Sequence, residues 1–493
     1  MKKLLNAAQT READQYTIHN EPITSLELME RASLAFVSEF EERVSTESLV
    51  AVVCGTGNNG GDGLAIARLL ESKHYSVKVI LVKVSSELSD DCLANLKQFG
   101  SDIDKVKPSE FVLPNSDVVV DALFGSGLNR PILGDLEHVV STINNAESKT
   151  FSVDVPSGLF SDEVNLTGAI VQADFTITFQ RPKLSFFIPE SGSFVGEWKA
   201  VNIGLDEDFV EAQNGSYFLL DHSIRKALPP RAKFQHKGHF GRVQVFAGSY
   251  GKMGAAFLCS KAAMKSGAGL LTAHVPKCGA QVLQTSLPEA MVSVDSEEQL
   301  ISEGSLQKNT DVVCFGPGVG VEQKTVQAFR QLLEAGVSRL VVDADGLNIL
   351  SEHSGLLDLL PESTVLTPHV GEFHRLFGKC SDGLERIKVA QSVAKKKKLV
   401  IILKGAHSAI IAPSGGVYFN NTGNAGMATA GSGDVLAGVV TGLMAQGLGS
   451  EQAACLGVFL HGLAGDLARK NVGEVSLMAS DLLHFLPKAI SNA

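Results

Sequence analysis

The chain has 493 residues, 44% of them hydrophobic, and a formal net charge of −11. An acidic balance argues against a general nucleic-acid binder, which needs a basic surplus to displace the counterions of phosphates. The composition is that of a folded protein, and at roughly 150 residues per domain the length predicts two or three domains.

The seven cysteines lie far apart and form no Cys-x-x-Cys pair. This spacing argues against a disulfide framework or a Cys-rich zinc site and favours a reducing compartment. Polar residues such as Asn6 and Gln9 interrupt the segment after the basic start, so we expect no signal peptide. The longest apolar runs, such as residues 399–403, are far shorter than the ~18 to 20 residues of a membrane span. We therefore expect a cytoplasmic protein that binds no membrane.

The first two hundred residues alternate strand-like and helix-like segments. Thr24 and Glu27 form a capping-box pair ahead of an apolar stripe with helical period. Five short, buried strands are then predicted, with helical stretches such as residues 63–71 between the earlier ones: 49–54, 77–82, 118–120, 151–155 and 175–179. This alternation predicts a Rossmann-like, doubly wound α/β domain with a parallel sheet covered on both faces.

The pattern weakens between about residues 205 and 235, where we predict the domain boundary. It restarts at Arg242 and predicts a second α/β domain with strands at 243–247, 270–275, 312–315, 340–343, 365–367 and 399–403. Residues 409–412 and 417–419 flank Gly415-Gly416 and predict a hairpin. The lysine run 395–398 is typical of a solvated helix end, where the macrodipole favours positive charge.

Three loops after first-half strands are rich in glycine and polar residues: 55–63, 121–127 and 154–158. Open α/β sheets bind ligands at the carboxyl ends of their strands, so these loops should meet at one edge. Gly55-x-Gly57-x-x-Gly60 satisfies the Rossmann fingerprint, but Lys83 stands where an NAD-binding acid would be expected. Two alternatives stay open, a standard dinucleotide fold and glycines that only permit a tight turn. The oxygen-bearing side chains among these loops suit a hard cation or a polyol-phosphate ligand.

The same loops resemble the NAD(P)HX epimerase family over about residues 1–212. The matching strings are Asn58-Asn59-Gly60-Gly61-Asp62-Gly63, Phe124-Gly125-Ser126-Gly127-Leu128 and Val153-Asp154-Val155-Pro156-Ser157-Gly158. The resemblance implies a substrate damaged by hydration: NADH or NADPH with a hydroxyl on the reduced nicotinamide ring.

The resemblance also implies roles for individual residues. A potassium ion would be held by Asn59, Asp121 and Ser157, and Asp154 would lie at the reacting carbon. Diphosphate and ribose contacts would come from two segments: Asn58, Asn59, Gly60, Gly61 and Asp62, and Gly125, Ser126, Gly127 and Leu128. Because the hydroxyl sits beside the ring nitrogen, a carboxylate that accepts and returns a proton would scramble its configuration. Asp154 as a plain strand-end hydrogen-bond acceptor, and a non-catalytic dinucleotide-binding module, stay open.

The most informative segment of the second half is 424–434, a run of small residues that ends in Asp434 before a helical stretch at 435–445. Backbone N–H groups ahead of a helix attract an anion, and the helix dipole adds to the attraction. A carboxylate in that position repels phosphate unless it has a task, such as taking a proton from an attacking hydroxyl. The alternative for Asp434 is a simple N-cap.

Gly431-Ser432-Gly433-Asp434 resembles the Gly-x-Gly-Asp motif of the ribokinase-like fold. Further strings resemble the ADP- or ATP-dependent NAD(P)HX dehydratases over residues 216–493, among them 248–256, 316–320, 343–348, 367–373, 404–408 and 461–466. The resemblance implies that Ala255, Gly318, His369 and Asp434 approach the hydrated dinucleotide. It places the nucleotide on two segments: Lys404, Gly405, Ala406, His407 and Ser408, and Asn424, Ala425, Gly426, Met427, Ala428, Thr429, Ala430, Gly431, Ser432 and Gly433.

The hypothesis is a bifunctional repair enzyme with an epimerase domain (1–212) and an ADP-dependent dehydratase domain (216–493). The expected ligands are NADHX, NADPHX, K⁺, and Mg²⁺ with ADP, since Mg²⁺ usually binds through nucleotide phosphates. We also expect a homo-oligomer. The rival for the second half is a vitamin or sugar kinase of the same fold, in which Asp434 would serve equally well.

Overall fold

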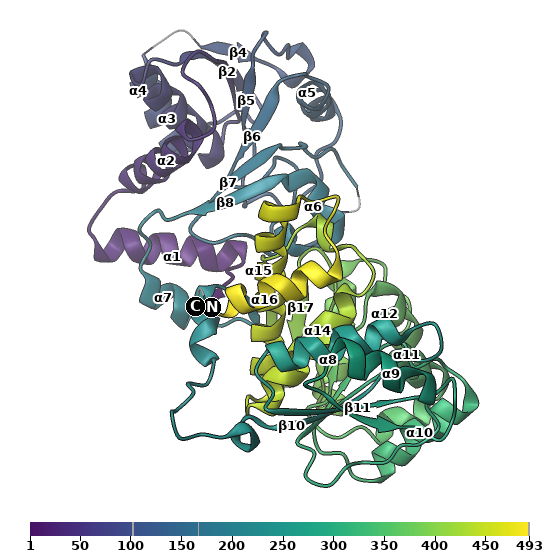
Figure 1. The fold of residues 1–493 in the computed structure, drawn as a ribbon. Coiled ribbons are helices and arrows are strands. Elements are labelled where there is room, and N and C mark those ends of the chain that lie inside the picture. The colour runs from purple at the N-terminus through teal and green to yellow at the C-terminus, as the bar shows by residue number, and fades with distance from the viewer. Residues whose placement is uncertain (101–102, 166, 492–493) are drawn as a thin grey trace. The chain divides into compact units, whose positions relative to one another are not determined.

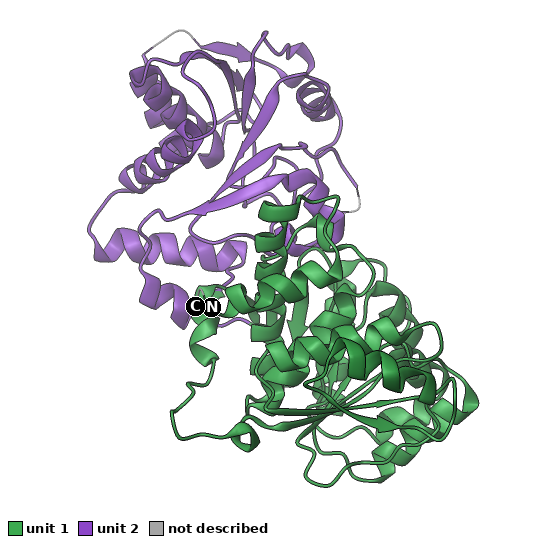
Figure 2. Cartoon of the chain, in the orientation of Figure 1, with its two compact units in different colours: residues 1–2, 216–493 green, residues 3–215 purple. Residues whose placement is uncertain are grey.

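A computed structural model describes residues 1–100, 103–165 and 167–491. The chain divides into two compact units, residues 3–215 and residues 1–2 with 216–493 (Figure 2). The assignment of one activity to each of the ranges 1–212 and 216–493 stays a prediction.

The unit of residues 3–215 is built on a seven-stranded parallel sheet in the order β4-β3-β2-β5-β6-β7-β8 (Figure 1). The predicted parallel α/β architecture is therefore confirmed. The strands are β2 (Leu49–Cys54), β3 (Ser76–Val82), β4 (Asp104–Val106), β5 (Val118–Ala122), β6 (Lys149–Val153), β7 (Phe175–Phe179) and β8 (Glu197–Val201). The helices are α1 (Ala7–Asn20), α2 (Ser25–Glu41), α3 (Asn58–Ser72), α4 (Asp90–Phe99), α5 (Asp135–Asn144), α6 (Pro189–Val195) and α7 (Glu207–Ala212).

Strand β2 is buried on both faces because alternate side chains enter different cores. Val50 and Val52 pack with residues of α2 and α3, whereas Ala51 and Val53 pack with residues of α5. The strand order reverses between β2 and β5, since β3 lies on one side of β2 and β5 on the other. Ligands of doubly wound sheets bind at such a switch point. The segments that follow β2 and β5 are the predicted site loops.

Two boundaries of the predicted site loops differ from the prediction. Residues 58–62 are not loop, because α3 already begins at Asn58 with Gly57 as its N-cap. An added Cβ at Gly60 would lie 1.9 Å from the carbonyl oxygen of Gly55, so only glycine permits this tight first turn. Asp121 likewise belongs to β5 and not to the following loop. The early helix start leaves its first backbone N–H groups without helical partners, which suits an anion.

The second unit contains an eleven-stranded mixed sheet in the order β1-β9-β18-β17-β16-β15-β14-β13-β10-β11-β12. The strands are β1 (Lys2–Lys3), β9 (Tyr217–Leu219), β10 (Arg242–Phe246), β11 (Leu270–Val275), β12 (Met291–Val294), β13 (Val312–Phe315), β14 (Leu340–Val342), β15 (Val365–Leu366), β16 (Val400–Leu403), β17 (Ala409–Ile411) and β18 (Val417–Phe419). Strands β17 and β18 form the predicted antiparallel hairpin. The first and last short strands, β1, β9 and β12, had no clear sequence pattern.

The helices of this unit are α8 (Met253–Lys265), α9 (Lys277–Ser286), α10 (Gln323–Glu334), α11 (Asp345–Glu352), α12 (Val370–Phe377), α13 (Gly383–Lys397), α14 (Ser432–Ala445), α15 (Ser450–Val472) and α16 (Ala479–Ser491). Helix α14 is buried from Val435 onward and packs closely on α8. Added Cβ atoms at Gly438 and Gly442 would lie 2.2 and 2.3 Å from carbonyl oxygens of α8. These two glycines therefore let α14 approach α8 closely.

Among the described residues, no helix combines the length and the apolar character that a membrane span requires.

Separate cores predict that the two units fold independently. The apolar clusters of each unit draw on residues of that unit alone among the described residues. Cutting the chain after Gly215 removes only β1 from the second sheet. We therefore expect both fragments to be soluble, to unfold cooperatively on heating and to keep one reaction each. Fragments that aggregate, or a fragment pair that needs mixing for either activity, would contradict this prediction.

Candidate active sites

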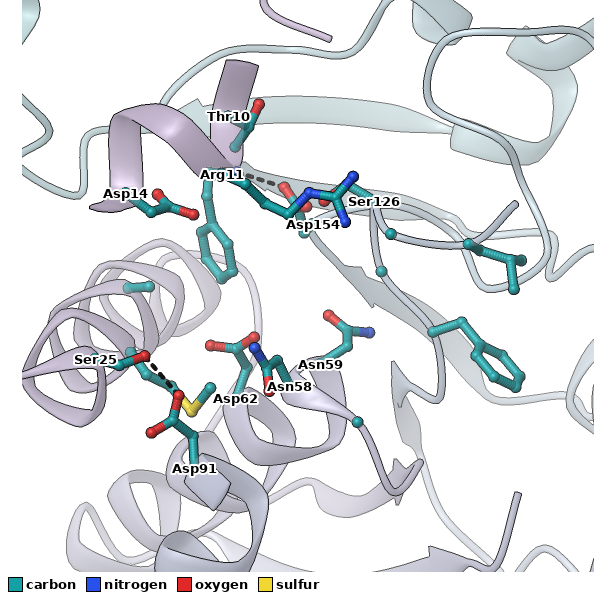
Figure 3. A pocket seen from close by; sticks show the side chains of 18 of the residues that line it. Thr10, Arg11, Asp14, Ser25, Asn58, Asn59, Asp62, Asp91, Ser126 and Asp154 are labelled. Carbon is teal, nitrogen blue, oxygen red and sulfur yellow. Dashed lines mark hydrogen bonds between the residues drawn. The ribbon is translucent and has the colours of Figure 1, made fainter. Parts of the chain in front are cut away.

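The unit of residues 3–215 contains a cavity of about 650 Å³ at the carboxyl ends of β2, β5 and β6. Helices α1, α2 and the start of α3 form its other walls (Figure 3). It is lined by most of the epimerase residues that the sequence suggested: Asn58, Asn59, Asp62, Gly125, Ser126, Gly127, Leu128 and Asp154. Gly60, Gly61, Asp121 and Ser157 are buried behind this lining.

Asp154 follows β6 in a strained backbone conformation, with φ at 64° in the left-handed region. Every hydrogen bond that described residues donate to its carboxylate goes to Oδ1: Thr178 Oγ1 and the backbone N–H of Phe179 donate at 3.0 Å, and Lys183 Nζ at 2.8 Å. Oδ2 accepts no hydrogen bond from any residue that the structure describes. Burial raises the pKa of Asp154, but Lys183 and the other donors outweigh it and hold the pKa below its usual range. Asp154 is thus an ionised carboxylate with one free oxygen.

Lys183 was missed by the sequence analysis. Its side chain is only 3% exposed and lies beside Asp154. The sequence feature that could have pointed to it is a lysine directly ahead of the largely apolar segment 184–188. A buried lysine needs a charged partner, so its pairing with a strand-end aspartate was physically expected once the two were close.

Asp121 and Ser157, two of the suggested potassium ligands, are in direct contact. Ser157 donates to Asp121 from Oγ at 2.6 Å and from its backbone N–H at 2.8 Å, and Ser152 Oγ donates at 2.8 Å. Asp121 is fully buried, burial raises its pKa, and no described lysine or arginine pairs with it. Asn59 is nearly buried and its amide Nδ2 has no partner among the described residues. Rotating that amide by 180° would place its oxygen there instead. The oxygen set and the uncompensated charge fit a cation.

In the second unit, Asp434 is the third residue of α14. The N-cap is Gly431, in the left-handed region at φ +87°, so the N-cap interpretation of Asp434 is wrong. Burial, followed by the nearby Asp343, raises the pKa of Asp434 to about 7, although Lys404 opposes this shift. A carboxyl poised near neutral pH at a helix start, where free backbone N–H groups attract an anion, is suited to general base catalysis.

Lys404 lies at the same helix start. Its Nζ is 2.8 Å from Asp343 Oδ1 and 3.8 Å from Glu372 Oε2. An added Cβ at Gly433 would lie 3.4 Å from this amine, which places Lys404 next to the Gly-x-Gly-Asp turn. Burial lowers the pKa of Lys404, but the surrounding carboxylates outweigh burial and raise it. Lys404 is therefore a fixed positive charge, and Asp343 and Glu372 are neighbours that the sequence analysis did not assign.

The other dehydratase residues lie around α14 or on separate loops. An added Cβ at Gly318 would lie 3.1 Å from the Ala255 Cβ, so these two residues adjoin. His369 is exposed, and its Nδ1 caps α12 by accepting the Gly371 N–H at 3.0 Å. The segment 405–408 follows β16, and 424–430 leads into α14. Asn424 is held there by Asp466 at 3.0 Å.

Comparison with known families assigns both units. Residues 243–488 match a family model described as NAD(P)H-hydrate dehydratase, and residues 25–185 match the YjeF-related protein N-terminus. The chain is 37% identical to a bifunctional NAD(P)H-hydrate repair enzyme of Moorella thermoacetica, over 99% of this chain and 97% of that one. It is 30% identical to the Escherichia coli enzyme of the same name, over 95% and 90%.

A solved structure supports the fold of the second unit. The chain is similar to a ribokinase-like superfamily protein of Enterococcus faecalis, with 27% identity and a TM-score of 0.52. The similarity covers 57% of this chain and 97% of that one. Both family models, the near full-length relatives and the two sites agree, and the chain belongs to the family of bifunctional NAD(P)H-hydrate repair enzymes.

Proposed function

We propose that the unit of residues 3–215 interconverts the R and S forms of NADHX and NADPHX. The observation that carries this proposal is the ionised Asp154, whose Oδ1 is saturated with donors and whose Oδ2 is left free beside the cavity. A carboxylate held in this way takes up a proton from a hydroxyl or a water at the carbon beside the ring nitrogen. Asn58, Asp62 and the segment 125–128 line the same cavity and would bind the diphosphate and ribose.

The second unit would dehydrate the S form at the expense of ADP. Asp434 takes the proton from the substrate hydroxyl, whose oxygen attacks the β-phosphorus of ADP and releases AMP. Phosphate is a far better leaving group than hydroxide. The ring nitrogen then expels phosphate, a proton leaves the adjacent ring carbon, and the dihydropyridine is restored.

The nucleotide would lie on the segments 404–408 and 424–433, at the start of α14. Ala255, Gly318 and His369 would contact the hydrated dinucleotide. Asp434, Asp343 and Glu372 outnumber Lys404 around this start. Such a site accepts a polyphosphate only when a cation neutralises it, and Mg²⁺ bound to the nucleotide phosphates would supply that charge.

One assay separates the proposed function from its rival. An equal mixture of both epimers is supplied with ADP and Mg²⁺, and the absorbance of reduced nicotinamide is followed. Complete recovery of the absorbance, with one AMP and one phosphate released per dinucleotide, is the expected result. A vitamin or sugar kinase would leave both epimers unchanged and would accumulate a stable phosphorylated product with its own substrate.

We also propose that K⁺ occupies the Asn59, Asp121 and Ser157 site and supplies positive charge near the diphosphate. Asp121→Asn keeps the size of the side chain but removes the negative charge that attracts the cation. We expect the epimerase site to bind its dinucleotide substrate more weakly and the epimerisation rate to lose its dependence on K⁺. Dehydration of the pure S epimer should be unchanged. The measurement is epimer exchange by NMR against K⁺ concentration.

Ser152→Ala is the matched control for this experiment. It removes one hydrogen bond to the same carboxylate but no charge and no suggested ligand. This control should keep the potassium dependence. Potassium-dependent epimerisation at wild-type affinity in Asp121→Asn would remove the cation assignment.

The seven cysteines form no disulfide, which agrees with a cytoplasmic location, and we include that location in the proposal.

A further inference from the structure

Asp14 lies on α1 and faces the cavity that also contains Asp154 (Figure 3). Helix α1 precedes the doubly wound pattern, so nothing in the sequence pattern marked it as part of a site. Four contacts fix the helix in place. The Ala7 N–H donates to Asp162 at 2.9 Å, the Asp206 N–H donates to Thr17 Oγ1 at 3.1 Å, Gln9 bonds Asn214, and the ring of Tyr16 stacks on Phe209. Asp14 is therefore held on a rigid wall.

The environments of Asp14 and Asp154 differ in their effect on protonation. The carboxyl of Asp14 accepts no hydrogen bond from the described part of the chain and is half-buried. Burial, followed by repulsion from Asp154, raises the pKa of Asp14 to about 6, although Lys183 opposes the shift. Asp154 has its pKa lowered by Lys183 and its other donors despite its burial. Two carboxyls in one cavity whose pKa values differ in this way can serve as a general acid and a general base.

Epimerisation by loss and return of the hydroxyl needs both groups. The C–O bond breaks as the ring nitrogen donates its lone pair, and the leaving oxygen takes a proton and departs as water. The resulting cation is planar at this carbon. A second water adds to the opposite face and gives up a proton. Inversion therefore requires a proton donor on one face of the ring and a proton acceptor on the other.

We propose that Asp14 is the proton donor on one face of the nicotinamide ring and Asp154 the acceptor on the other, so that the two exchange roles when the reaction runs backward. This inference rests on the epimerase function proposed above and assigns its second group. Asp14 comes from α1 and Asp154 from the end of β6, two different walls of the cavity (Figure 3). Lys183 is the positioning residue, because it keeps Asp154 ionised while Asp14 carries the proton.

Other charged groups around Asp14 are either paired or lie elsewhere on the cavity wall. Arg11, Asp62, Asp91 and Arg130 line the cavity, and Asp91 accepts a hydrogen bond from Ser25 at 2.6 Å. Burial and the neighbouring carboxylates raise the pKa of Asp62 well above its usual range, so it adds little negative charge. The charged residues of α2 and α7, which pack against α1, are mostly paired: Arg31 with Glu21, Glu30 with Arg68, and Glu207 and Glu211 with Arg181.

The test is the pH profile of epimerisation in the full-length Asp14→Asn variant. In the wild type, kcat/KM should fall as the pH rises through the pKa of Asp14, because the donor loses its proton. Asp14→Asn should lower the rate by ~10² to 10⁴ and abolish this alkaline decline. Asp14→Glu, which restores a carboxyl, should recover part of the rate and the decline.

Glu12→Gln is the matched control, since Glu12 is exposed on the same helix and does not line the cavity. It should behave as the wild type does. In water labelled with ¹⁸O, each inversion by the wild type should introduce one solvent oxygen at the reacting carbon. Inversion with retention of the original oxygen would overturn the inference, as would a slowed Asp14→Asn variant that keeps the alkaline decline. A wild type that does not epimerise at all would instead overturn the proposed function.

Discussion

Asp434→Asn should lower the rate of dehydration by ~10² to 10⁴, the usual contribution of a general base. Asparagine keeps the size of the side chain but cannot accept the proton of the substrate hydroxyl. ADP affinity should hold or improve, because a negative charge beside the nucleotide phosphates is removed. Epimerisation should be unaffected. The measurements are single-turnover dehydration, ADP titration and epimer exchange on the same variant.

The pH dependence follows from the same group. Burial and Asp343 raise the pKa of Asp434 to about 7, and the base must be ionised to act. Wild-type dehydration should therefore increase with pH up to about 7 and then level off, and residual activity in the variant should lack this step. Because the folded state holds this proton more tightly than the unfolded one, stability falls as the pH rises from the usual range of a carboxyl to about 7, and the loss is complete above pH 7. The variant should thus melt at an equal or higher temperature at pH 8.

Asp382→Asn is the matched control for Asp434→Asn. Asp382 is a true N-cap, which accepts the Glu385 N–H at 2.8 Å at the start of α13. Asparagine caps a helix about as well as aspartate, so this variant should keep full activity and stability. Near-normal dehydration in Asp434→Asn would remove the general-base assignment.

The sequence predicted the central strands of both sheets but not their edge strands, because buried parallel strands leave continuous β-branched runs. Residues 49–54, 175–179 and 270–275 are strands with the predicted bounds. The loops after β2, β5 and β6 line the first site, because the carboxyl ends of parallel strands lie at one edge of a sheet. The start of α3 was predicted too late, because Asn58, Gly60 and Gly61 are poor helix formers. Tertiary packing decides their conformation, as in the close approach of Gly60 to the Gly55 carbonyl.

Charge pairs and groups that reach a site from outside its motifs could not be predicted in this way. Asp14 lies on a helix with only two buried residues, and Asp14 and Asp154 are far apart in the sequence. Lys404 was expected to contact a nucleotide, but the structure adds that its amine also pairs with Asp343, 61 residues away. Such contacts depend on three-dimensional packing, which no local spacing records.

Asp154→Asn should lower epimerisation by a similar ~10² to 10⁴. It should also destabilise the unit of residues 3–215, because Lys183 is left as a buried charge without its partner. Breaking a buried ion pair from one side typically costs about 3 to 5 kcal/mol. Loss of activity in this variant alone would therefore not separate catalysis from folding.

The double variant Asp154→Asn with Lys183→Met removes both charges and should separate the two effects. Methionine is apolar and similar in length to lysine, so much of the lost stability should return while epimerisation stays at the level of the single variant. Lys183→Met alone leaves a buried carboxylate without its cation, so the pKa of Asp154 should rise. Epimerisation by this variant should then decline at acidic pH where the wild type does not. Recovery of activity together with stability in the double variant would show that Asp154 only supports the fold, and the thermal unfolding curve and the epimer exchange rate at pH 5 to 8 decide between the two outcomes.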